Sequence, residues 1–95
     1  MKSETMHLLI SGLVQGVGYR ASLQREATAR HIEGWVRNLA SGQVEALVCG
    51  TPFAIDSLLD WARQGPPGAR VDEIGCEPSS ASVPPGYGFQ VHPSP

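Results

Sequence analysis

The sequence contains little of what several classes of protein require. Its 95 residues include only two cysteines, Cys49 and Cys76, which are too few for a disulfide framework and have no partner at metal-ligand spacing. No apolar run approaches the length of about 18 residues that crosses a bilayer, and the first residues lack the apolar stretch of a signal peptide. We therefore expect a reduced, cytoplasmic protein without a membrane span.

Positive charge is also scarce. Seven Lys and Arg residues stand against nine Asp and Glu residues, a formal net charge of −2, and Lys2 is the only lysine. This balance argues against non-specific nucleic-acid binding, which depends on clustered cations. Apolar residues at 41% and charged residues at 17% are ordinary for a folded domain. A chain this short predicts one domain over residues 1–95, folded over about residues 6–92 with short flexible termini.

Hydrophobic patterning predicts two helices and five strands. Helices are expected at residues 19–30 and 52–64, because apolar side chains recur there at helical spacing. Strands are expected at residues 7–14, 34–39, 44–48, 69–76 and 87–91. The order β-α-β-β-α-β with a short terminal strand predicts an α+β, ferredoxin-like two-layer sandwich. In this arrangement both helices cover one face of an antiparallel sheet, and the other face is open to water.

A glycine-rich turn connects the first predicted strand to the first predicted helix. Gly16 and Gly18 allow successive backbone N–H groups to converge, and the helix that follows presents its N-terminus; both features favour an anion. Arg20 stands in the first helical turn, where a cation is unfavourable for the helix dipole. A guanidinium there matches the oxygens of a phosphate. For this segment alone, a tight turn followed by a solvated arginine is the commoner explanation.

Asn38 is a second polar residue that the predicted topology brings toward this turn. The strands at residues 7–14 and 34–39 are expected to run parallel with another strand between them, so their C-terminal ends share one end of the sheet. A neutral amide has a donor and an acceptor and can hold a water while polarising a bound group. An asparagine that stabilises the following hairpin turn explains the residue equally well.

Two longer motifs resemble the signatures of the acylphosphatases. The first is Gly12-Leu13-Val14-Gln15-Gly16-Val17-Gly18-Tyr19-Arg20. The second is Gly34-Trp35-Val36-Arg37-Asn38, followed by Gly42-Gln43-Val44 and then Gly50. The similarity continues to the closing Tyr87-Gly88-Phe89-Gln90-Val91, so it covers about residues 6–92.

This resemblance implies hydrolysis of small acyl phosphates, the mixed anhydrides of a carboxylic acid and phosphate, to a carboxylate and inorganic phosphate. In the family, the asparagine matching Asn38 positions the attacking water. The phosphoryl group is bound by the arginine matching Arg20 and by the backbone N–H groups of a loop matching Gln15, Gly16, Val17, Gly18 and Tyr19. We therefore expect a monomeric enzyme that binds inorganic phosphate as its product and inhibitor.

The residues of both motifs agree with an activated substrate. Hydrolysis of an unactivated phosphate ester needs a general acid or a metal, yet neither motif contains His, Asp, Glu or Cys before Glu45. An acyl phosphate expels a stabilised carboxylate, so positioning and charge stabilisation suffice. We expect no metal and no cofactor, and we expect the substrate phosphate to accept the proton of the attacking water.

Two other functions fit parts of the sequence. A non-catalytic module of the same fold would use the anion site to bind phosphate or an acyl phosphate, although Arg20 and Asn38 argue against it. A single-stranded RNA binder would use the open sheet face, but the first strand has no aromatic residue and the net charge has the wrong sign.

Several other polar side chains are expected to have no part in catalysis. His31 stands at the exit of the first helix, where the family usually has a glycine that suits a left-handed backbone. We expect Cys49 to lie on the open face of the sheet, Glu45 to be a solvated strand residue, and His7 and His92 to be an outward strand residue and a tail residue.

Overall fold

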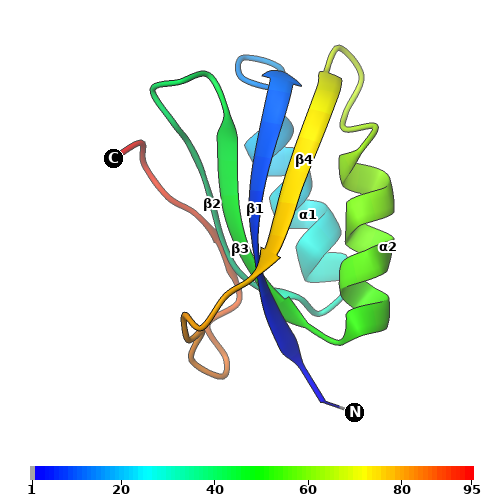
Figure 1. Ribbon diagram of the computed structural model, residues 1–95, viewed down its shortest axis with the longest axis vertical. Helices are drawn as coiled ribbons and strands as arrows, with labels where there is room; N and C mark the ends of the chain where they lie inside the picture. The colour runs from blue at the N-terminus through cyan, green and yellow to red at the C-terminus, as the bar shows by residue number, and fades with distance from the viewer. Residues whose placement is uncertain (1) are drawn as a thin grey trace.

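The computed structural model describes residues 2–95, in which two helices pack on one face of a five-stranded sheet (Figure 1). The elements in chain order are β1 (Glu4–Leu13), α1 (Tyr19–Ala29), β2 (Glu33–Asn38), β3 (Val44–Gly50), α2 (Pro52–Ala62), β4 (Arg70–Pro78) and β5 (Phe89–Val91). This is the predicted order, with β1 beginning three residues earlier than expected. Neither of these helices is long and apolar enough to cross a membrane.

The strands lie side by side in the order β4-β1-β3-β2-β5. The pairs of β1 with β4, β1 with β3 and β2 with β3 are antiparallel, whereas β2 and β5 are parallel. The sheet is therefore mixed, and the wholly antiparallel sheet that we predicted omits this last pair. The difference arises because the pairing of β5 depends on contacts distant in sequence. With β3 between them, β1 and β2 run parallel as predicted, and both end beside the β1–α1 loop.

Both helices begin at the residues that the sequence predicts, and they end one and two residues earlier than predicted. Thr51 Oγ1 accepts a hydrogen bond from the Ala54 backbone N–H at 3.2 Å, and Pro52 occupies the first turn of α2, as is typical of a helix N-terminus. His31 has a φ of 58° just after the end of α1, so this histidine adopts the left-handed conformation expected at that position.

One apolar layer lies between the sheet and the helices. Alternate residues of each strand face it, because side chains alternate between the two faces of a sheet. Cys49 falls in the other set and lies on the open face, as expected. The buried side chains of this layer include Leu8, Ile10, Leu23, Ala27, Val36, Val44, Ala46, Val48, Ile55 and Leu58.

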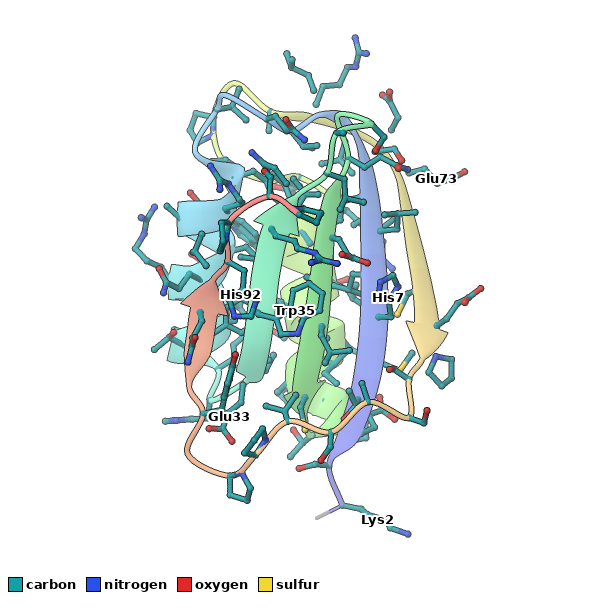
Figure 2. All side chains as sticks on the ribbon, turned by 90° about the vertical axis from the view of Figure 1, so that its left-hand side faces the viewer. Lys2, His7, Glu33, Trp35, Glu73 and His92 are labelled. Carbon is teal, nitrogen blue, oxygen red and sulfur yellow. The ribbon has the colours of Figure 1, made fainter. Side chains whose placement is uncertain are left out.

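The open face of the sheet carries a row of polar and aromatic side chains (Figure 2). His7 Nε2 lies 2.8 Å from Glu45 Oε2, and Arg37 Nε donates to Glu45 Oε1 at 2.6 Å. The Arg37 guanidinium lies 5.0 Å from the centroid of the Trp35 ring, which also stacks with His92. Partial burial raises the pKa of the Glu45 carboxyl, but hydrogen bonds with His7 and Arg37 outweigh it and lower the pKa overall.

The expectation that Glu45 is solvated is therefore wrong, because its neighbours across the sheet supply two partners that no local pattern reveals. His7 is an outward strand residue as expected. His92, expected to be a simple tail residue, makes two side-chain contacts: its ring stacks with Trp35, and its Nε2 lies 3.1 Å from the Tyr87 hydroxyl oxygen.

Tyr19 connects the start of α1 to the end of α2. Its side chain is buried, its ring centroid lies 5.7 Å from that of Trp61, and its hydroxyl donates to the Ala62 carbonyl oxygen at 2.7 Å. Burial raises the pKa of the Tyr19 phenol, so the hydroxyl keeps its proton. The last carbonyl groups of a helix have no partner within that helix, and Tyr19 satisfies one of them.

Tyr19→Phe should reduce the free energy of unfolding by about 1–2 kcal/mol, because the buried carbonyl loses its donor. Urea unfolding followed by circular dichroism measures this change. Tyr87→Phe removes the same atom from a half-buried side chain and should cost less than about 0.5 kcal/mol. Equal losses in both variants would contradict a special role for the Tyr19 hydroxyl.

Candidate active site

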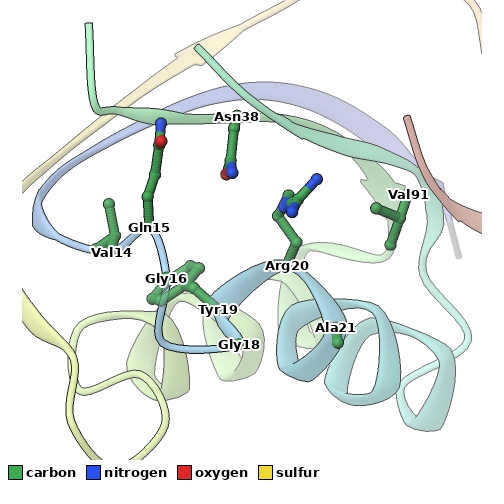
Figure 3. A pocket seen from close by; sticks show the side chains of 9 residues that line it. All are labelled: Val14, Gln15, Gly16, Gly18, Tyr19, Arg20, Ala21, Asn38 and Val91. Carbon is green, nitrogen blue, oxygen red and sulfur yellow. The ribbon is translucent and has the colours of Figure 1, made fainter. Parts of the chain in front are cut away.

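A pocket of about 210 Å³ lies where β1 leads into α1 (Figure 3). Its walls come from the β1–α1 loop, the first turn of α1, the end of β2 and the end of β5. The pocket brings Arg20 and Asn38 together, as the predicted topology requires. The described residues that line it are Val14, Gln15, Gly16, Gly18, Tyr19, Arg20, Ala21, Asn38 and Val91.

The β1–α1 loop presents its backbone to this pocket. Gly16 and Gly18 have φ values of 77° and 76°, in the left-handed region that glycine adopts without a steric penalty. Apart from the neighbours of each glycine in the chain, no atom of residues 2–95 would lie within 4 Å of a Cβ atom at either position, so the backbone conformation rather than crowding requires glycine. The space beside the loop backbone is open to a ligand.

The first turn of α1 adds further backbone donors to the pocket. The helix begins at Tyr19 after Gly18, and within residues 2–95 no side chain caps it. The first N–H groups of a helix have no partner within the helix and carry a partial positive charge. The loop and the helix start therefore form one surface of donors suited to an anion.

Arg20 extends from α1 toward the sheet and lies between the loop and Val91 (Figure 3). It is half-buried and forms no ion pair with any carboxylate of residues 2–95. Beside an uncapped helix start, an unpaired cation is unfavourable unless an anion lies near it. The arginines that do pair with a carboxylate are Arg30, Arg37, Arg63 and Arg70.

Asn38 enters the pocket from the last residue of β2, and its side chain lies between those of Gln15 and Arg20 (Figure 3). Its Oδ1 is buried and has no hydrogen-bond partner in the described part of the chain. A buried acceptor without a partner costs about 1–3 kcal/mol. The alternative that the Asn38 side chain stabilises the hairpin turn loses support, because the Leu39 N–H and the Gln43 carbonyl oxygen close the hairpin at 2.9 Å.

Gln15 connects the loop to the hairpin that follows Asn38. Its Nε2 donates to the carbonyl oxygens of Leu39 at 2.8 Å and Gln43 at 2.9 Å. These two hydrogen bonds hold the loop against the hairpin that follows β2, and they set the spacing between the loop donors and Asn38. Sequence reasoning assigned only the backbone of Gln15 and missed this role of its side chain, because both acceptors belong to a distant segment.

The structure places most of the predicted site residues together and adds two more. Val17 does not line the pocket; its half-buried side chain packs against the core, and a role for its N–H stays a prediction. Ala21 and Val91 line the pocket and were not predicted. Ala21 follows Arg20 directly, whereas Val91 lies at the pocket because β5 pairs with β2, and this pairing has no local signal in the sequence.

No group of three or more His, Cys, Asp or Glu side chains within residues 2–95 is placed to hold a metal ion.

The fold and the pocket define a small α+β domain with an opening suited to an anion. The family model for acylphosphatase matches residues 6–91. The chain is similar to a curated acylphosphatase from Alcanivorax borkumensis, with 56% identity over 70 residues that cover 74% of this chain and 76% of the relative. A curated acylphosphatase from Thermococcus kodakarensis is 51% identical over 74 residues, covering 78% of this chain and 81% of the relative.

The solved structure of an acylphosphatase from Coxiella burnetii is also similar, with a TM-score of 0.88 and 34% identity over 95% of this chain and 93% of that chain. The chain therefore belongs to the acylphosphatase family. The predictions of this family, of an acylphosphatase enzyme and of an α+β, ferredoxin-like fold are confirmed.

Proposed function

We propose that the enzyme holds the phosphoryl group of a small acyl phosphate on Arg20 and the loop N–H groups of residues 15–19, while Asn38 positions the attacking water. The observation that carries the proposal is the buried Asn38 Oδ1, which lies in the same pocket as Arg20; within residues 2–95 the oxygen has no hydrogen-bond partner and the guanidinium has no carboxylate partner. The amide oxygen needs a hydrogen-bond donor, and the guanidinium needs an anion. A water molecule and a phosphoryl group meet these two needs together.

The proposed reaction breaks the bond between phosphorus and the carboxylate oxygen. The oxygen of the water forms a bond to phosphorus, and the electron pair of the broken bond leaves with the carboxylate. Arg20 and the loop N–H groups stabilise the negative charge that spreads over the phosphoryl oxygens. No described residue lining the pocket is a carboxylate, an imidazole or a thiol, so a phosphoryl oxygen accepts the proton of the water.

Hydrolysis of benzoyl phosphate by the purified chain tests this proposal. We expect release of benzoate, with competitive inhibition by inorganic phosphate. A non-catalytic binding module would instead bind phosphate in a calorimeter without releasing benzoate, and that outcome would reject the proposed hydrolysis.

The RNA-binding alternative has little support, because Trp35 on the open face already contacts Arg37 and His92.

We also infer that residues 1–95 form one domain that acts as a cytoplasmic monomer. The described residues share one cluster of buried side chains. Cys49 and Cys76 are free thiols, as is typical of a reducing compartment. Light scattering after size-exclusion chromatography should give the mass of one 10.1 kDa chain.

Gln15→Met keeps the length of the side chain and removes the donor that connects the loop to the hairpin. We expect kcat for benzoyl phosphate to fall about 10- to 100-fold, because small displacements of positioned groups slow a reaction strongly. Gln43→Met is the control: it removes the bond from Gln43 Nε2 to Ser11 Oγ but leaves the backbone carbonyl that Gln15 contacts. Equal losses in both variants would show that the connection through Gln15 is not what matters.

A further inference from the structure

The pocket has two chemically different ends. One end holds the loop backbone, Asn38 and the guanidinium of Arg20. Beyond Arg20, on the side away from Gln15, the pocket is lined by Ala21 and Val91 (Figure 3). Neither of these side chains has a polar atom, so this end offers contact area without charge or hydrogen-bonding side chains.

The backbone that carries Val91 is fixed on both sides. Gln24 Nε2 of α1 donates to the Phe89 carbonyl oxygen at 2.9 Å, and the His92 N–H donates to the Val36 carbonyl oxygen at 2.8 Å. Val91 lies directly opposite Val36 in the parallel pair of β5 with β2. It nevertheless leaves 39% of its surface exposed. An exposed apolar side chain held rigidly at a pocket is a surface that a ligand can cover.

We infer that Val91, together with Ala21, contacts the acyl group of the substrate and makes the enzyme favour acyl phosphates whose acyl part is uncharged and apolar. This inference rests on the proposed function, because Arg20 and the loop fix the phosphoryl group at the other end. An apolar acyl group that covers Val91 removes apolar surface from water, which is favourable. A charged acyl group placed there would lose water, and Arg20, the charged side chain beside it, is already engaged by the phosphoryl group.

Val91→Ala tests the contact by removing two methyl groups. We expect kcat/KM for benzoyl phosphate to fall about fivefold and that for acetyl phosphate to fall less than about twofold, because one methyl group covers little of the Val91 surface. Each variant is compared with the unaltered enzyme on the same substrate, so differences in the intrinsic reactivity of the two substrates cancel. Equal losses on both substrates would contradict the inference.

Val91→Lys tests the specificity by reversing it. We expect the ratio of kcat/KM for succinyl phosphate to kcat/KM for benzoyl phosphate to rise about tenfold, because the ammonium attracts the free carboxylate that only the succinyl group carries. Any effect of the ammonium on the phosphoryl group is common to both substrates and cancels in the ratio. Gln90→Lys is the matched control: Gln90 is exposed, precedes Val91 on β5 and does not line the pocket. Its ratio should change less than about twofold.

The contact at Val91 and the proposed hydrolysis are distinguished by different results. If the unaltered enzyme hydrolyses acyl phosphates but Val91→Lys leaves the ratio unchanged or shifts it no more than Gln90→Lys, the inference about Val91 is overturned and the proposed function stands. If the unaltered enzyme hydrolyses none of the three substrates, the proposed function is rejected.

Discussion

Arg20→Ala should lower kcat/KM for benzoyl phosphate by about 1,000-fold or more and should also weaken inhibition by inorganic phosphate. An arginine that stabilises a transferring phosphoryl group contributes about 10³–10⁵ in kcat. Among the described residues that line the pocket, Arg20 alone carries a charge. Its removal therefore takes the cation from the bound phosphate and from the transition state, so kcat falls and KM rises together.

The surroundings of Arg20 also predict what its loss leaves intact. Arg20 has no carboxylate partner within residues 2–95, so Arg20→Ala breaks no ion pair and should change the free energy of unfolding by less than about 0.5 kcal/mol. Arg25→Ala is the matched control, because Arg25 is exposed on the same helix and donates to Ser22 Oγ. It should keep activity within about twofold.

Arg20→Lys separates charge from geometry. Lysine keeps the positive charge but lacks the planar pair of donors that matches two phosphoryl oxygens. We expect inhibition by phosphate to recover further than kcat does in this variant. Phosphate inhibition in Arg20→Ala equal to that of the unaltered enzyme would show that the anion binds elsewhere.

Sequence alone was sufficient for the parts of the site that depend on local backbone. The left-handed conformations of Gly16 and Gly18 and the helix start beside Arg20 follow from residues that are close together in the chain. The approach of Asn38 to this loop needed one more step, the predicted strand order, and hydrophobic patterning supplied it. The loop and the helix start were predictable because their signals lie in one short segment, and the position of Asn38 was predictable because the strand order follows from the pattern of the individual strands.

Other features could not be predicted, because they depend on pairings across the sheet. Val91 lines the pocket only because β5 pairs in parallel with β2. Glu45 is held by His7 and Arg37 from the two neighbouring strands, and the Gln15 side chain finds its acceptors on the β2–β3 hairpin. In each case the residue type permits many partners, and the three-dimensional register selects one.

Asn38→Ala should lower kcat for benzoyl phosphate by about 100- to 1,000-fold, the range found when one positioned polar group is removed from a reacting centre. Inhibition by inorganic phosphate should change less than about threefold, because Arg20 and the loop N–H groups remain. This split between kcat and phosphate binding distinguishes Asn38 from Arg20, which affects both. Identical behaviour of the two alanine variants would contradict the separate roles that we assign to them.

Asn38→Ala should change the free energy of unfolding by less than about 0.5 kcal/mol, because the Asn38 Oδ1 has no hydrogen-bond partner within residues 2–95 that the substitution could remove. Urea unfolding in phosphate-free buffer measures this change. A purely structural asparagine would instead show a loss of stability together with a loss of activity. Unchanged stability with lower kcat would mean that the Asn38 amide serves the water that the reaction needs and not the fold.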